Sequence, residues 1–185
     1  MQDYGQLPRM RTTHARSVDK RIILVSGIPA SGKSSFCRWL EAVKGFFHLD
    51  VENSQTDFQK LSLAQSFSRC VTIGTTETFL RDLEAVGKPA VVDWGFPPEC
   101  LPIVRKLKAS GVEVWWFDAD AKAAREAFIK RGGISLVAFD RQTTKIQHIL
   151  TDILSVFNPN VICALGRDGK YLSPEDIYSR VFSKQ

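Results

Sequence analysis

Long hydrophobic runs are missing from this sequence of 185 residues. No apolar stretch approaches the roughly 18 residues that a membrane-spanning helix requires. The first twenty residues are polar and contain no hydrophobic core of a signal peptide. These absences argue against a membrane protein and a secreted protein, so we expect a soluble, cytoplasmic protein without a membrane partner.

Cysteine and histidine are also few, and no CxxC pair or zinc-ligand spacing occurs among them. They are spread along the chain as Cys37, Cys70, Cys100, Cys163, His14, His48 and His148. This pattern predicts reduced, mostly buried thiols rather than a disulfide scaffold. It also predicts that no metal cage is built from cysteine and histidine.

Charge of both signs is present, but it is unevenly distributed. The chain carries a formal charge of +5, and residues 1–21, with five basic and two acidic side chains, account for +3 of it. We therefore divide the chain into a basic arm, residues 1–20, and one domain, residues 21–185. Such an arm could bind nucleic acid through phosphate charge, although short basic termini are more often solvated tails.

Apolar runs of strand length alternate with segments of helical periodicity, without repeats or low-complexity sequence. The expected strands are 21–26, 46–49, 90–93, 112–117 and 161–165. The expected helices are 33–43, 101–110, 121–130, 141–156 and 174–182, with a helical stretch within 53–86 and a loop over 131–139. Alternation of this kind predicts an α/β three-layer sandwich, with a five-stranded parallel sheet between two layers of helices.

The first expected strand runs into a phosphate-binding motif, GxxxxGK[ST]. Its glycines let several backbone N–H groups turn inward, and the following helix adds the positive end of its dipole. Lys33 is placed to reach the β- and γ-phosphates of ATP, and the hydroxyl of Ser34 to coordinate Mg²⁺. The expected nucleotide contacts are Gly27, Ile28, Pro29, Ala30, Ser31, Gly32, Lys33, Ser34 and Ser35.

With this motif between a strand and a helix, the chain resembles the P-loop NTPases, and more narrowly their small kinase branch. That branch includes kinases of the zeta-toxin, chloramphenicol phosphotransferase, gluconate kinase and polynucleotide 5′-kinase types. The resemblance implies a nucleoside-kinase-like fold with a short lid, and ATP and Mg²⁺ as cofactors. The chain has no NKxD motif, which disfavours a GTPase, and its size disfavours a large motor ATPase.

Two expected strands end in aspartate, and in open α/β sheets ligands bind outside the carboxyl ends of the strands. By the resemblance, Asp50 is the general base that accepts the proton of the acceptor hydroxyl, with Glu52 as the alternative. Asp93 resembles a Walker B carboxylate that holds Mg²⁺ together with Ser34. Either aspartate could instead cap the segment that follows it.

A charged lid is expected after the fourth strand. Arg131 stands beside two glycines and resembles the arginine that folds over the phosphates in small P-loop kinases. Arg125 and Arg141 are the alternatives for this charge. An arginine at a helix end could also be a surface residue that offsets the helix dipole.

The function that these features favour is transfer of the γ-phosphoryl group of ATP to a hydroxyl of a small molecule, with Lys33, Asp50 and Arg131 as catalytic residues. One alternative is a polynucleotide 5′-hydroxyl kinase that uses the basic arm. The other is a nucleotide-binding regulatory ATPase without phosphotransfer. A kinase should have a second concave pocket beside Asp50, whereas a switch should show only the nucleotide site and an apolar patch for its partner. No motif identifies the acceptor or the oligomeric state.

Overall fold

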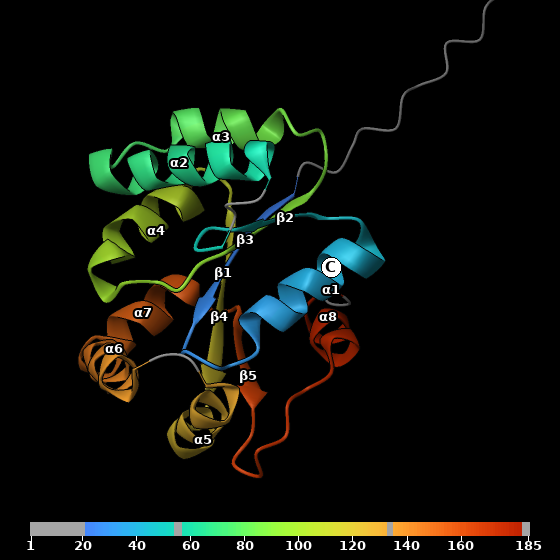
Figure 1. Ribbon diagram of the computed structural model, residues 1–185. Coiled ribbons are helices and arrows are strands. Elements are labelled where there is room, and N and C mark those ends of the chain that lie inside the picture. The colour runs from blue at the N-terminus through green and yellow to red at the C-terminus, as the bar shows by residue number, and fades with distance from the viewer. Residues whose placement is uncertain (1–20, 54–56, 133–134, 183–185) are drawn as a thin grey trace, which may run out of the picture.

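The computed structural model describes residues 21–53, 57–132 and 135–182, so the predicted basic arm of residues 1–20 lies outside it. Five parallel strands form one sheet in the order β2-β3-β1-β4-β5 (Figure 1). The strands are β1 (Ile22–Gly27), β2 (Phe47–Asp50), β3 (Ala90–Asp93), β4 (Glu113–Ala119) and β5 (Val161–Leu165). All five expected strands are present, and each boundary lies within one or two residues of its predicted position.

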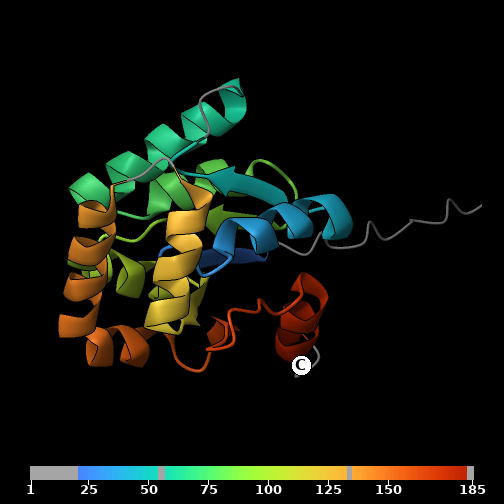
Figure 2. The same cartoon turned by 60° about the horizontal axis from the view of Figure 1, so that its bottom comes forward.

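Helices cover both faces of this sheet, which confirms the predicted three-layer α/β architecture. They are α1 (Lys33–Lys44), α2 (Phe58–Ile73), α3 (Glu77–Glu84), the short 3₁₀ helix η1 (Pro98–Cys100), α4 (Leu101–Ala109), α5 (Ala121–Arg131), α6 (Leu136–His148), α7 (Leu150–Phe157) and α8 (Pro174–Phe182). Helices α1 and α8 lie side by side on one face (Figures 1 and 2). The core of the other face is built with residues of α2 to α7. Among the described residues, no helix combines the length and hydropathy needed to cross a bilayer.

Side-chain alternation along the strands separates two hydrophobic cores. In β1, Ile23 and Val25 belong to the core beneath α1 and α8, while Leu24 belongs to the core on the opposite face. In β4, Trp115 and Trp116 divide in the same way. The strands are therefore buried on both sides, which explains their nearly continuous apolar sequences.

The segment between β4 and β5 departs from the prediction. The expected loop over 131–139 is helical from Leu136 onward, and the single expected helix over 141–156 is two helices with a break at Ile149. In the first turn of α6 the apolar residues Leu136 and Val137 are exposed and do not belong to a buried face. The sequence there therefore lacks the apolar spacing by which a helix is predicted. The break lets α7 turn and bury Ile153 and its neighbours in the core next to β4.

The strand order brings the carboxyl ends of β1, β2 and β3 to one edge of the sheet. The chain leaves β1 for β2 and β3 on one side, and then passes to β4 on the other side of β1. Ligands of open α/β sheets bind where the strand order reverses in this way. The loop after β1 lies at this position.

Candidate active site

The loop between β1 and α1 begins at a glycine that no other residue can replace without movement of the backbone. Gly27 has φ 151°, and a Cβ built on it would lie 2.1 Å from the carbonyl oxygen of Phe117 in β4. The next amide, that of Ile28, donates a hydrogen bond of 3.0 Å to the same oxygen. The start of the loop is thus pressed against β4, which fixes its direction.

The backbone of the loop then turns into α1 without placing a capping side chain at the N-terminus of the helix. Ala30 has φ 62°, and Gly32, the residue before the helix, has φ 94° and provides no side-chain cap. The first turn of α1 contains no acidic residue. Uncapped N–H groups and the positive end of the helix dipole favour an anion at this point. The Ser31 hydroxyl is fully buried here and has no hydrogen-bond partner among the described residues.

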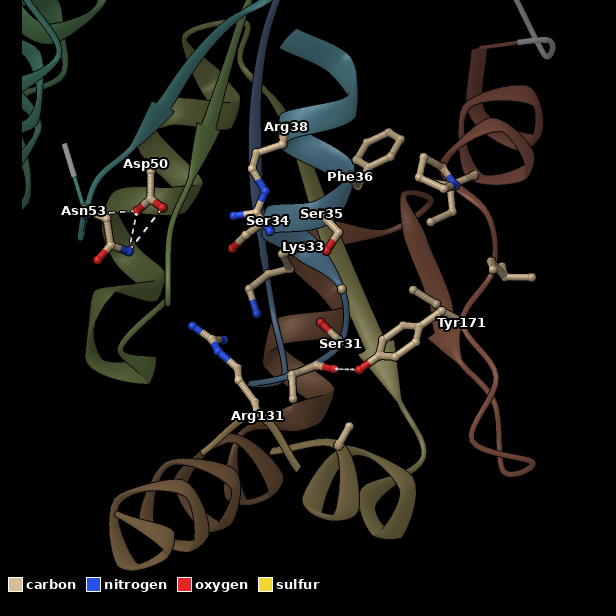
Figure 3. Close-up of a pocket in the computed structure, with 17 residues that line it drawn as sticks. Ser31, Lys33, Ser34, Ser35, Phe36, Arg38, Asp50, Asn53, Arg131 and Tyr171 are labelled. Atoms are coloured by element: carbon tan, nitrogen blue, oxygen red, sulfur yellow. Dashed lines mark hydrogen bonds between the residues drawn. The ribbon is translucent and has the colours of Figure 1, made fainter. Parts of the chain in front are cut away.

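Tyr171, from the segment between β5 and α8, braces the loop. Its hydroxyl donates a hydrogen bond of 2.8 Å to the carbonyl oxygen of Ala30 (Figure 3), and its ring lies against Gly32. A side chain at Gly32 would meet this ring, since a Cβ there would lie 3.2 Å from it. No local sequence pattern predicts this contact, because it joins residues 141 positions apart.

Lys33 lies at the start of α1 and is buried. Its ammonium group donates hydrogen bonds to the carbonyl oxygens of Gly27, at 3.2 Å, and Ile28, at 2.8 Å. Burial lowers the pKa of Lys33, and the charges of Asp93 and Glu52 oppose this effect. A phosphate bound in the loop could replace these two carbonyl groups as the partner of the ammonium.

Asp93 ends β3 in a buried position beside Ser34. Burial by itself would raise the pKa of Asp93, but the polar side chains of His48 and Ser34 and the charge of Lys33 outweigh it and hold the pKa below the ordinary value. Its Oδ2 is buried and has no hydrogen-bond partner among the described residues. A carboxylate and a hydroxyl are oxygen ligands of the kind that Mg²⁺ prefers, so the residues present fit this ion.

Asp50 is the last residue of β2. Its carboxylate caps the following turn, and the residue also lines a cavity. Its Oδ1 accepts hydrogen bonds from the backbone amides of Glu52, at 3.1 Å, and Asn53, at 3.0 Å. The Asn53 side-chain amide contacts both carboxylate oxygens at 3.2 Å (Figure 3). Glu52, the alternative base, is exposed, and its carboxylate packs against Gly95.

The three candidate lid arginines lie in different places. Arg131 lines the cavity from the end of α5, and Figure 3 shows its side chain and that of Lys33 pointing toward each other. Arg125 instead pairs with Asp140 of α6, with Nε and Oδ1 3.2 Å apart. Arg141 is exposed on α6 and does not line the cavity.

A cavity of about 590 Å³ connects the phosphate-binding loop with Asp50 and Arg131, whereas Asp93 does not line it. It is lined by Ala30, Ser31, Gly32, Lys33, Ser34, Ser35, Phe36, Arg38, Asp50, Asn53, Ala127, Arg131, Ala164, Tyr171, Leu172, Pro174 and Ile177. Of the expected nucleotide contacts, Gly27, Ile28 and Pro29 form the base of the loop and do not line the cavity. Arg38 and Asn53 were not predicted; they reach it because α1 and the turn after β2 converge there.

The structure also brings together three side chains whose sequence spacing gave no such indication. One ligand atom from each of Cys37, His48 and Asp93 lies within 4.8 Å of the others, and all three residues are buried. Cysteine and histidine that are scattered in sequence are therefore adjacent in the fold, directly behind the phosphate-binding loop.

No protein-family profile matches the chain, and no curated protein matches it either. Among solved structures, shikimate kinase from Bacteroides thetaiotaomicron superposes with a TM-score of 0.54 at 10% identity, over 89% of this chain and 97% of that one. A gluconokinase from Sinorhizobium meliloti 1021 gives a TM-score of 0.46 at 15% identity, over 86% and 88% of the two chains. Deoxyadenosine kinase from M. mycoides gives 0.47 at 14% identity, over 88% and 97%. The superposition with shikimate kinase shows that the two proteins share a fold.

Proposed function

We propose that the protein is an ATP-dependent phosphotransferase that moves the γ-phosphoryl group to a hydroxyl of a small molecule. The observation that carries this proposal is the continuity of the cavity. One space of about 590 Å³ reaches from the phosphate-binding loop to the carboxylate of Asp50. A transferred phosphoryl group and an acceptor hydroxyl need such a shared space, because they react in line at short distance.

The loop and its neighbours would bind the triphosphate. The open N-terminus of α1 offers backbone N–H groups, and Lys33 and Arg131 supply two positive charges that approach the same part of the cavity. Charge that develops on the transferring group is stabilised most by fixed cations at that position. Ser34 and Asp93 would hold Mg²⁺, which when bound neutralises charge on the β- and γ-phosphates.

Asp50 would orient the acceptor hydroxyl and take its proton. The backbone amides of Glu52 and Asn53 and the Asn53 side chain fix the carboxylate, while the residue still faces the cavity. A general base must be held within hydrogen-bond distance of the proton it removes, and these contacts provide that positioning.

The second pocket expected beside Asp50 is not separate, because Asp50 lines the same cavity as the phosphate-binding loop. The kinase is therefore supported by this shared space and not by a second pocket. The volume of the cavity lies in the range of small-ligand sites and must accommodate both the triphosphate and the acceptor group. The proposal includes a cytoplasmic location, where ATP and Mg²⁺ are available.

The test is a screen of hydroxyl-bearing acceptors with the full chain, ATP and Mg²⁺, in which ADP release and the mass of the product are measured. Asp50→Asn should reduce acceptor-dependent turnover about 100-fold or more, because the amide cannot take the proton. Asp57→Asn is the matched control. Asp57 also caps a backbone amide, that of Lys60 at 3.0 Å, but it does not line the cavity.

Full turnover in Asp50→Asn would refute the assignment of the base. A protein that shows a thermal shift with ATP and Mg²⁺, while no acceptor raises ADP release, would support the regulatory ATPase instead. Deletion of residues 1–20 distinguishes the polynucleotide kinase, whose affinity for a 5′ end should fall with the arm and with added salt.

A further inference from the structure

Cys37, His48 and Asp93 form a compact group of three different metal-binding side chains. Cys37 comes from α1, His48 from β2 and Asp93 from β3, and their nearest ligand atoms all lie within 4.8 Å of one another. At most 5% of each residue is exposed. Among the described residues, no other cluster of histidine, cysteine and acidic side chains has this arrangement.

The register of the sheet explains why these residues meet. His48 lies opposite Val91 in the parallel pair of β2 and β3, so both side chains point to the same face. Asp93 follows Val91 by two residues and shares that face, which is covered by α1. Cys37 follows Lys33 by one helical turn and so lies on the same side of α1, directly behind the phosphate-binding loop.

Two atoms in this group lack the partners that burial requires. His48 Nε2 and Asp93 Oδ2 lie 3.7 Å apart, within ion-pair distance but too far for a hydrogen bond, and neither atom has a hydrogen-bond partner among the described residues. Buried polar atoms without partners are costly and uncommon in folded proteins. The sulfur of Cys37 lies within 4.8 Å of a ring nitrogen of His48 and of a carboxylate oxygen of Asp93.

A carboxylate lies near the other nitrogen of the histidine ring, beyond hydrogen-bond distance. His48 Nδ1 lies 3.6 Å from Oε2 of Glu41, which belongs to α1. In metal sites a carboxylate commonly orients the ligating histidine through its other ring nitrogen, which leaves Nε2 free for the metal. Glu41 would have to move closer to His48 to take this role, because 3.6 Å exceeds hydrogen-bond distance.

We propose that Cys37, His48 and Asp93 form a site for a thiophilic divalent cation of the Zn²⁺ class, and that occupation of this site inhibits the enzyme. One sulfur, one imidazole nitrogen and one carboxylate oxygen suit Zn²⁺ or Co²⁺, whereas Mg²⁺ prefers oxygen ligands. With metal–ligand bonds of about 2.0–2.3 Å, the three ligand atoms would have to draw closer by roughly 1 Å. Water would complete the tetrahedron, as in other three-ligand sites.

Binding exchanges a proton for the metal. The Cys37 thiol releases its proton to solvent, and the sulfur lone pair forms the bond to the cation. Thiolate and carboxylate together bring two negative charges, which balance the dication. Lys33, one turn away, opposes a cation electrostatically, but its ammonium is directed to the carbonyl oxygens of Gly27 and Ile28.

Inhibition follows because Asp93 belongs to both sites. The proposed function needs the carboxylate of Asp93 to bind Mg²⁺. A cation bound to Cys37 and His48 would coordinate the same carboxylate, which would then no longer be available to Mg²⁺. This second half of the inference rests on the proposed function, whereas the metal site itself does not. The two are therefore tested separately.

The site is tested with Co²⁺ as the probe, on the full chain without nucleotide or acceptor. We expect one Co²⁺ per chain, with visible d–d bands of tetrahedral geometry and a near-ultraviolet thiolate charge-transfer band, all displaced by Zn²⁺. Cys37→Ser should abolish the charge-transfer band and weaken binding about 100-fold, as should loss of the imidazole in His48→Gln.

Cys70→Ser is the matched control, because Cys70 is the other buried thiol in the core but belongs to no such group among the described residues. It should keep the full spectrum. Circular dichroism of each variant establishes that the fold is retained. No charge-transfer band in the unmodified protein, or a band that persists in Cys37→Ser, would overturn the site.

Inhibition is tested by titration of Zn²⁺ into the ADP-release assay at fixed Mg²⁺, with each variant compared with its own metal-free rate. The unmodified protein and Cys70→Ser should be inhibited and should recover on chelation. Cys37→Ser should need at least tenfold more Zn²⁺. Equal inhibition of Cys37→Ser would overturn the inhibitory role. A Cys37-dependent Co²⁺ spectrum in a protein that phosphorylates no acceptor would refute the proposed function and leave the metal site standing.

Discussion

Asp50 and Asp93 lie opposite each other in the register of β2 and β3, at the carboxyl ends of neighbouring parallel strands. Their environments differ even though their positions match. Asp93 is buried among His48, Ser34 and Lys33, which together lower its pKa. Asp50 is partly exposed, is fixed by amides of the following turn and faces the cavity. The pair thus provides one buried carboxylate suited to a cation and one accessible carboxylate suited to a substrate.

Replacement of Lys33 by methionine should abolish function without loss of the fold. The aliphatic stem stays, while the buried charge whose pKa burial lowers is removed. We expect acceptor-dependent ADP release to fall about 100-fold or more, as for loss of a single charge-stabilising donor. The thermal shift with ATP and Mg²⁺ should also shrink. Lys44→Met, at the other end of α1 over the ring of Tyr178, is the control and should behave as the unmodified protein. Turnover at the normal rate in Lys33→Met would contradict the placement of the phosphates.

The lid assignment is tested by two arginines of the same helix. Arg131→Ala removes a charge that lines the cavity and should lower turnover about 100-fold. Arg125→Ala breaks only an exposed ion pair with Asp140, which contributes at most about 1 kcal/mol to stability, so turnover should be nearly unchanged. Steady-state kinetics of both variants decide between the two positions, and the reverse order of effects would assign the role to Arg125.

Gly27→Ala should be strongly destabilising. The new methyl group would lie 2.1 Å from the Phe117 carbonyl oxygen, so β1 and β4 would have to separate. Such overpacking costs about 1–3 kcal/mol, and strain at φ 151° adds to it. In Gly87→Ala a Cβ meets nothing within 4 Å, and only the left-handed conformation, at about 1–2 kcal/mol, is penalised. Urea denaturation followed by tryptophan fluorescence should therefore give a larger loss for Gly27→Ala. Equal losses of unfolding free energy in the two variants would mean that the backbone around Gly27 can move to accommodate the methyl group at little cost.

Asp118→Asn should stabilise the protein at neutral pH. Burial raises the pKa of Asp118 above its ordinary 3.8, and the neighbouring polar groups of Ala119 and Trp116 only partly oppose this. The folded state then holds the proton more tightly than the unfolded state, so stability falls as pH rises from 3.8 through the raised pKa. The asparagine variant lacks this loss. The difference in unfolding free energy between the two proteins should be largest at pH 7 and should disappear below pH 3.8. A difference in unfolding free energy that does not change with pH would contradict a raised pKa of Asp118.

Local sequence determined the strands, the first helix and the phosphate-binding loop. Each is encoded over a few neighbouring residues, by β-branched runs or by glycines at fixed spacing, so periodicity and motif suffice to find it. Asp50 and Asp93 were also found in this way, since each is simply the residue that ends a strand.

The break between α6 and α7 at Ile149 was not predicted from the sequence, because it depends on tertiary packing. A continuous apolar periodicity over 141–156 is compatible with one helix, and only the position of β4 makes a turn into α7 favourable. The choice among Arg125, Arg131 and Arg141 was likewise left open by the sequence. It depends on which side of α5 and α6 faces the loop.

Tertiary structure alone decided the contacts between distant segments. The hydrogen bond from Tyr171 to Ala30 requires that the segment after β5 return to the loop after β1. The meeting of Cys37, His48 and Asp93 requires that β3 lie next to β2 and that α1 cover that face. Strand order and layer geometry arise from burial of the whole core, a property of the folded chain that no short segment encodes. The sequence by itself therefore specified the phosphate-binding motif and five strands, and the fold decided which side chains lie together with them.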